Sequence, residues 1–453
     1  MNTSSSPGAG TPGSPPLSRL LELTADVVAA VRAGRSLTDA LAACPPPARP
    51  GTQALAFAVL RRWGSAAAAR EHLAPRTPPP VVDALLTSAL ALLWPDEAPP
   101  YPDHTLVDQA VTAARHKVPA AAGFINAVLR RFIREREAVV AQAGRQPLGA
   151  WNHPDWWVQR LRHDWPTQWQ ALLAQAQQRP PMVLRVNTRR VSRALYLERL
   201  AAAGLRARAV DGAGWEQAVI LTEPCPVDRL PGFSAGEVSV QDLAAQLAAP
   251  LLLDDAPPLA DGARVLDACA APGGKTAHLL ERRPDLHLLA LDADPNRLAK
   301  VDETLRRLGL AGPGVATRAA DARQTATWWD GEPFDAILLD APCTASGIVR
   351  RHPDIRWLRR PEDVSALART QAELLEALWP LLKPGGRLLY ATCSLFQAEG
   401  RGQIDAFLQR ATPDGPRVAK DSPGHLLPLA DNDRQNPDAA LADGFFYALL
   451  HKP

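Results

Sequence analysis

From about residue 237 onward, short apolar runs alternate with segments of helical periodicity. Strands that are apolar along their whole length are buried on both faces, and the helices between them supply the cover. The alternation therefore predicts an α/β fold with a doubly wound, mostly parallel sheet over residues 237–453. The predicted strands lie at 263–267, 287–292, 334–340, 386–391 and 445–450.

Three other segments precede this sheet. Residues 1–16 are rich in Ser, Gly and Pro, which predicts a disordered tail. Residues 17–144 show helical periodicity almost throughout, which predicts an all-α domain. Residues 145–236 contain a strand at Met182–Asn187, a helix at Ser192–Ala203 and further short strands, which predicts a small α+β domain.

The composition favours a globular protein in a reducing compartment. The chain is 46% hydrophobic and 22% charged, with a net charge of +2. It has no apolar run of the roughly 20 residues that a membrane helix needs, and its start does not resemble a signal peptide. We therefore predict a cytoplasmic protein that does not contact membranes. The 5 cysteines are scattered without a C-x-x-C pair, which argues against a disulfide framework and against a metal site.

A glycine-rich loop follows the first strand of the predicted sheet. It spans Cys269–Lys275 and leads into a helix. Ligands of such sheets bind beyond the carboxyl ends of the strands, and Gly273 and Gly274 let the backbone approach a ligand closely. The loop has neither G-x-G-x-x-G nor the spacing of a P-loop, so a pyrophosphate site is not indicated.

Acidic residues follow the strands in order. Asp292, at the end of the second strand, can accept hydrogen bonds from two ribose hydroxyls. Asp321 can bind the exocyclic amine of an adenine, and Asp267 and Asp340 complete the series. A nucleoside recognised without phosphates indicates S-adenosylmethionine. The alternative is that these acids are ordinary strand-end caps.

Two further loops each place a cysteine after a predicted strand. They are Asp340-Ala341-Pro342-Cys343 and Thr392-Cys393-Ser394, and they lie at the same sheet edge as the glycine loop. A lone loop cysteine is usually an inert apolar residue, and we interpret Cys44 and Cys225 in that way. Two thiols and a carboxylate beside a nucleoside site instead indicate covalent chemistry.

Together the three loops resemble the RNA cytosine-5 methyltransferases of the NOL1/NOP2/Sun family. Residues 17–144, with Phe124–Phe132, resemble a NusB-type RNA-binding domain, and Pro180–Asn187 resembles the small domain that precedes the catalytic domain in this family. The resemblance implies a Rossmann-like, S-adenosylmethionine-dependent methyltransferase domain and, from the three-part order, action on 16S rRNA. We also predict a monomer. The cofactor loop would comprise Cys269, Ala270, Ala271, Pro272, Gly273, Gly274 and Lys275, with Asp292, Asp321 and Asp340.

The resemblance also implies a role for each catalytic residue. Cys393 would add to C6 of cytosine, because this makes C5 reactive enough to attack a methyl group. Asp340 would hold the base and offset charge, and Lys275 would orient Asp340. Cys343 would assist the release of the methylated base.

The segment that follows Cys343 is rich in arginine. Guanidinium groups next to an aromatic ring suit phosphate binding and base stacking. We therefore predict RNA contacts from this segment, with backbone contacts from the helical domain. The candidates are Arg350, Arg351, His352, Arg356 and Trp357, together with Arg130 and Arg131.

The sequence departs from the family pattern at two places. Gln397-Ala398-Glu399-Gly400 replaces the usual Pro-Glu-Glu-Asn, and Asp321 lacks a preceding glycine.

Three alternatives to this function remain open. A DNA cytosine-5 methyltransferase should carry a Glu-Asn-Val motif, and a dehydrogenase should carry G-x-G-x-x-G; this chain has neither. An inactive RNA-binding assembly factor would not need both thiols.

Overall fold

A computed structural model describes residues 15–95, 99, 101–410, 415–429 and 437–453. Most of the predicted tail, residues 1–14, lies outside this range. The chain forms two compact units. The first extends to Gln159 and includes His352–Arg359, and the second contains Arg160–Arg351 and Arg360–Pro453. None of the described helices combines the length and the apolarity that crossing a bilayer requires.

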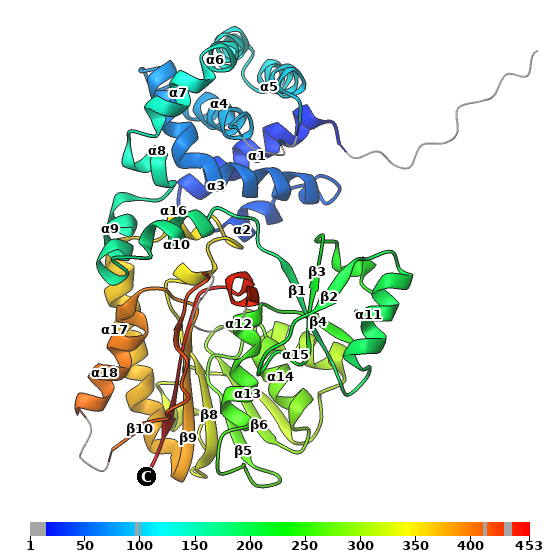
Figure 1. The fold of residues 1–453 in the computed structure, drawn as a ribbon, viewed down its shortest axis with the longest axis vertical. Coiled ribbons are helices and arrows are strands. Elements are labelled where there is room, and N and C mark those ends of the chain that lie inside the picture. The colour runs from blue at the N-terminus through cyan, green and yellow to red at the C-terminus, as the bar shows by residue number, and fades with distance from the viewer. Residues whose placement is uncertain (1–14, 96–98, 100, 411–414, 430–436) are drawn as a thin grey trace, which may run out of the picture. The chain divides into compact units, whose positions relative to one another are not determined.

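The first unit is helical, as predicted (Figure 1). Its core is made of aliphatic side chains at helical spacing, such as Leu21, Val28, Leu85 and Leu129. The short helix α16, although distant in sequence, packs against this core through Trp357. The helices are α1 Leu17–Arg32, α2 Leu37–Ala42, α3 Arg49–Leu73, α4 Pro80–Leu92, α5 Asp103–Lys117, α6 Ala122–Arg134, α7 Arg136–Ala143, α8 Pro147–Trp151 and α16 Ile355–Leu358; α9 Asp155–Asp164 spans the division between the units.

The second unit begins with α10 (Trp169–Gln175) and a small antiparallel sheet of order β2-β3-β1-β4. Its strands are β1 Met182–Val186, β2 Ala207–Ala209, β3 Ala218–Leu221 and β4 Val238–Val240, and its helix is α11 Arg193–Ala202. The Ser192 hydroxyl accepts a hydrogen bond from the Leu195 amide at 3.2 Å and caps α11. β4 pairs with β1, so the small sheet draws on residues beyond 236.

A larger sheet follows, and its strand order places the functional loops. In the described part of the chain it has the order β10-β12-β9-β8-β5-β6-β7, with β11 paired to β12. β5 lies between β6 and β8 and is parallel to both, so the strand order reverses there. Open sheets of this kind bind ligands at such a switch point. The strands are β5 Arg264–Asp267, β6 His287–Asp292, β7 Val315–Ala319, β8 Phe334–Asp340, β9 Leu382–Thr392, β10 Arg417–Val418, β11 Gly424–Leu426 and β12 Phe445–His451.

Helices cover both faces of this sheet (Figure 1). Alternate residues of β5 point to opposite faces: Val265 packs with α14 and α15, and Leu266 packs with α17 and α18. The apolar runs of the sequence thus reflect burial on both sides, and the predicted doubly wound fold is confirmed. The helices are α12 Leu243–Gln246, α13 Ala248–Leu253, α14 Gly274–Arg282, α15 Pro295–Leu308, α17 Pro361–Leu378 and α18 Arg401–Arg410.

Candidate active site

The glycine loop connects β5 to α14. Gly273 has a φ of +95°, a left-handed conformation that favours glycine, and an added Cβ would lie 3.0 Å from the Val301 Cα. The Ala270 amide donates to the Leu291 carbonyl at 2.7 Å, which ties the loop to β6. The loop is therefore anchored to β6 at the switch point, and α14 begins within it at Gly274.

Three of the four predicted acids end strands of the sheet (Asp267, Asp292 and Asp340), and Asp321 follows β7. Asp292 is buried and accepts hydrogen bonds from the amides of Ala271 at 3.2 Å and Asp294 at 3.1 Å. Asp321 forms an ion pair with Arg323 at 2.7 Å, and the hydrogen bond from Arg323 lowers the pKa of Asp321. These two carboxylates are oriented by main-chain or arginine donors, which is the preorganisation that binding a nucleoside requires.

Asp267, at the end of β5, fits a site for a polar ligand. Its Oδ2 accepts a hydrogen bond from the Thr276 hydroxyl at 2.6 Å, whereas its buried Oδ1 has no hydrogen-bond partner among the described residues. Buried polar atoms are rarely left in this state. Burial raises the pKa of Asp267 to about 7. The loop and this oxygen together fit a cofactor that carries amino and hydroxyl donors.

The raised pKa of Asp267 predicts a pH effect on stability. Between the ordinary pKa of 3.8 and about 7, the folded chain holds a proton that the unfolded chain releases. The free energy of unfolding should therefore fall as the pH rises through this window, by at most about 4 kcal/mol. Asp267→Asn should remove that fall. Denaturant titrations of both ligand-free proteins at about pH 5 and about pH 8 measure it; identical pH dependences would contradict the assignment.

The two cysteine loops meet at the carboxyl ends of β8 and β9. The Cys343 Sγ lies 3.5 Å from the Cys393 Sγ, although 50 residues separate them. The hydrogen bond with Cys393 and burial raise the pKa of Cys343 well above its usual value. Cys343 is buried and Cys393 is partly exposed. The geometry thus pairs a protonated, enclosed thiol with one that a substrate can reach.

Lys275 and Asp340 form an ion pair in the same site. Their side chains are 2.6 Å apart, and the Lys275 ammonium lies over the Phe445 ring, 5.2 Å from its centroid. Burial alone would lower the pKa of Lys275, but the charge of Asp340 and the hydrogen bond to it raise that pKa above its ordinary value. Lys275 is therefore held in its charged form and orients the Asp340 carboxylate.

In the second unit, Arg350 and Arg351 are engaged with the protein itself. The Arg350 Nε lies 2.5 Å from the Asp443 Oδ1, and both side chains are buried. Arg351 donates to Asp242 at 2.7 Å and to the Pro181 carbonyl at 3.0 Å. Both arginines thereby hold the loop after Cys343, and we do not propose RNA contacts for them.

In the first unit, two further RNA candidates pack into the helical domain, Arg356 fully buried and Trp357 partly buried. Arg356 is fully buried, and burial lowers its pKa to about 9. Trp357 donates from Nε1 to the Leu60 carbonyl at 2.9 Å, and its ring meets Trp63 edge-on at 4.6 Å. These contacts stabilise the helical unit, and we do not propose RNA contacts for either residue. His352 remains exposed.

The sequence reasoning overlooked three features of the site. Phe445 lies under Lys275, Asp443 neutralises the two arginines after Cys343, and Glu399 is buried beside both cysteine loops. Phe445 begins the apolar C-terminal strand β12 and Asp443 lies two residues before it, so nothing in the sequence identifies them as site residues. For Glu399 a signal existed, because it lies in the altered stretch that follows Cys393.

Comparison with known proteins identifies the family of this chain. Residues 257–451 match the model of the 16S rRNA methyltransferase RsmB/F family, residues 153–228 match the ferredoxin-like domain of RsmF/B-like methyltransferases, and residues 21–134 match the NusB family. Ribosomal RNA small subunit methyltransferase B of Xanthomonas campestris is 45% identical over 430 residues, which cover 92% of this chain and 93% of the relative. The chain belongs to the RsmB/F family of methyltransferases.

Two other comparisons agree with this assignment. Ribosomal RNA small subunit methyltransferase B of Vibrio cholerae is 46% identical over 352 residues, 78% of this chain and 77% of the relative. The crystal structure of PH0851 has a TM-score of 0.72 at 23% identity, covering 95% of this chain and 99% of that one, and supports the fold. The predictions of a NusB-like domain, a small α+β domain and an S-adenosylmethionine-dependent methyltransferase are thus confirmed.

Proposed function

We propose that this protein transfers a methyl group from S-adenosylmethionine to C5 of a cytosine in 16S rRNA, through a transient bond between Cys393 and C6. The observation that carries the proposal is the pair of sulfur atoms 3.5 Å apart beside the Lys275–Asp340 ion pair. The curated relatives, named as small-subunit rRNA methyltransferases, support the choice of substrate. A cytoplasmic location and a monomeric state belong to the same proposal.

The chemistry explains why two thiols are needed. The Cys393 thiolate adds to C6, and the electrons of the C5–C6 double bond make C5 a nucleophile towards a sulfonium methyl group. A base then takes the proton from C5, the electrons of that C–H bond restore the C5–C6 double bond, and the S–C6 bond breaks so that Cys393 leaves as a thiolate. Cys343 assists this elimination, and Asp340 holds the N3 edge or amino group of the base.

Each cofactor residue would contact a different part of S-adenosylmethionine, which supplies the electrophilic methyl group. The glycine loop, Cys269–Lys275, would let the cofactor approach the main chain. Asp292 would accept hydrogen bonds from the ribose, and Asp321 would accept one from the adenine amine. The free Oδ1 of Asp267 would take up a donor of the same ligand.

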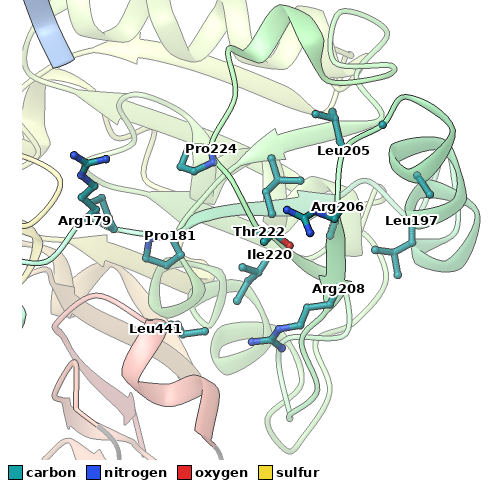
Figure 2. Close-up of a pocket in the computed structure, with 15 residues that line it drawn as sticks. Arg179, Pro181, Leu197, Leu205, Arg206, Arg208, Ile220, Thr222, Pro224 and Leu441 are labelled. Carbon is teal, nitrogen blue, oxygen red and sulfur yellow. The ribbon is translucent and has the colours of Figure 1, made fainter. Parts of the chain in front are cut away.

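We assign the rRNA contacts to exposed residues rather than to the buried or ion-paired arginines that follow Cys343. In the first unit, Arg130 on α6 is exposed and Arg131 partly so, and we propose backbone contacts there and at His352. In the second unit, a hollow of about 940 Å³ on the small domain is lined by Arg179, Arg206 and Arg208 (Figure 2). We propose that it receives a single-stranded segment of the RNA backbone.

Neutralising this hollow should weaken RNA binding without affecting the chemistry. In Arg179→Ala/Arg206→Ala, the affinity for rRNA should fall and its salt dependence should become shallower, by about one to two released counterions. Titrations at several salt concentrations measure both quantities. Lys383→Ala is the control, because Lys383 lies near the start of β9, at the opposite end of that strand from Thr392. An unchanged salt slope in the double variant would exclude the hollow.

Methyl transfer to RNA tests the function itself. The protein with S-adenosylmethionine labelled on the methyl group should label 16S rRNA, and ribonuclease should release that label. Bisulfite sequencing of rRNA from a deletion strain should show one cytosine that has lost its protection. Label that resists ribonuclease would favour a DNA methyltransferase, and no transfer to RNA would favour a non-catalytic assembly factor.

A further inference from the structure

Glu399 is a fully buried carboxylate close to the two thiols. It lies in the single 3-10 turn η6, Gln397–Glu399, between the Cys393 loop and α18. A carboxylate without solvent is costly unless hydrogen bonds replace its hydration. The position of Glu399 therefore requires donors from the surrounding loops.

Four donors surround this carboxylate. Its Oε1 accepts from the Thr344 amide at 2.8 Å and from the Gln371 Nε2 at 3.3 Å, and its Oε2 accepts from the hydroxyls of Thr344 at 2.5 Å and Ser394 at 2.6 Å. All four donors are uncharged. Among the described residues, no arginine, lysine or histidine forms an ion pair with Glu399.

The donors come from both cysteine loops. Thr344 follows Cys343 and Ser394 follows Cys393, so one side chain joins the two loops directly next to their sulfur atoms. Gln371, on α17, also donates to the Pro342 carbonyl at 2.9 Å and fixes the first loop from behind. The carboxylate is thus the common acceptor of three segments that are far apart in the sequence.

In the altered stretch after Cys393, Glu399 is the one acidic residue retained from the family pattern. Compared with Pro-Glu-Glu-Asn, the segment Gln397–Gly400 has alanine in place of the first glutamate and glycine in place of the asparagine. The Gln397 side chain turns away from the thiols and donates to the Asp164 carbonyl at 2.7 Å. The acid that remains is the one whose side chain points between the two cysteine loops.

We propose that Glu399 is a positioning residue that clamps the Cys343 loop to the Cys393 loop and so fixes the spacing of the two sulfur atoms. The inference rests on the proposed function, since the spacing matters only if both thiols act on one base. Glu399 contacts neither sulfur directly and acts through Thr344 and Ser394. Its charge also contributes, after the hydrogen bond with Cys393 and burial, to the raised pKa of Cys343.

Glu399→Gln tests the clamp with little change of volume. The amide places a donor where Glu399 faces only donors, so at least one of the four contacts must break. We expect the single-turnover rate of methyl transfer to fall about 100-fold, because about 1 Å of misplacement has that effect. Affinities for S-adenosylmethionine and RNA should stay within about twofold. Glu362→Gln, exposed on α17, is the matched control and should behave as wild type.

A second readout separates positioning from general loosening of the domain. If Cys343 no longer faces the adduct, release should slow more than attack, and Glu399→Gln should accumulate covalent protein–RNA complex on denaturing gels. Simple destabilisation would lower adduct and product together. Glu399→Asp, which keeps the charge, should recover part of the rate. If Glu399→Gln does not fold, Ser394→Ala and Thr344→Val, each lacking one donor, should show the same accumulation.

Wild-type rate without adduct in Glu399→Gln would overturn the inference, as would wild-type behaviour of the two donor variants. Cys393→Ala, assayed in parallel, keeps this outcome separate from the proposed function. Full turnover by Cys393→Ala removes the covalent mechanism itself. An inactive Cys393→Ala beside a fully active Glu399→Gln removes only the clamp.

Discussion

Cys393→Ala should abolish methyl transfer, whereas Cys343→Ala should still attack RNA but remain covalently attached to it. The reason is that the two thiols act at different steps of the reaction. Without Cys393 no bond to C6 forms, and C5 stays unreactive. Without Cys343 the bond forms and the methyl group is transferred, but elimination lacks its assisting thiol. Each substitution removes one sulfur atom, and the two sulfur atoms lie only 3.5 Å apart.

Denaturing gels with labelled 16S rRNA distinguish the two variants. Cys343→Ala should give a slowly migrating protein–RNA band that carries the methyl label, and Cys393→Ala should give neither band nor product. Cys225→Ala, in the small domain, is the control and should turn over normally. An adduct in Cys393→Ala, or full turnover by it, would show that the roles of the two cysteines are assigned wrongly.

The sequence predicted those parts of the fold whose signal is local. β6 and β8 have the bounds that their apolar runs predict, because strands buried on both faces are marked along their whole length. The convergence of Cys343 and Cys393 followed from the rule that parallel strands end at one sheet edge. The ion pair of Lys275 with Asp340 likewise needed only the order of the strands.

The sequence could not separate arginines that bind RNA from arginines that hold the fold. Arg350 and Arg356 lie six residues apart in one basic segment, yet each is buried, in different units. The acid that neutralises Arg350 is Asp443, almost a hundred residues further along the chain. A guanidinium has the same chemistry in both roles, so only the location of its partner decides between them. The environment of Glu399 could not be predicted from the sequence for the same reason, since its four donors come from three separate segments.

Substitution of Arg185 should have a large effect on stability and on cofactor binding. It lies on β1 with its side chain fully buried, and its Nε and Nη2 each lie 2.9 Å from a carboxylate oxygen of Glu281 on α14. Its Nη1 donates to the Gly274 carbonyl at 2.9 Å. One guanidinium therefore joins the small sheet, the cofactor helix and the glycine loop.

Arg185→Met should destabilise the second unit by about 3–5 kcal/mol, because it leaves the carboxylate of Glu281 buried without its partner. It should also weaken the binding of S-adenosylmethionine, because the glycine loop loses the hydrogen bond from Arg185 to the Gly274 carbonyl. Denaturant titration and calorimetric titration with the cofactor measure the two effects. Arg401→Met, which breaks an exposed pair with Asp405 on α18, should change stability by less than about 1 kcal/mol.

The double variant Arg185→Met/Glu281→Met decides whether the buried charge causes the loss. If the single substitution is costly because it strands a carboxylate, removing that carboxylate should restore most of the stability. The affinity for S-adenosylmethionine should not recover, since the Gly274 carbonyl still lacks the hydrogen bond from Arg185. The double variant would then recover stability but not cofactor affinity, compared with Arg185→Met alone. Equal recovery of both would mean that Arg185 affects the loop only through overall folding, and that its bond to Gly274 does not position the cofactor.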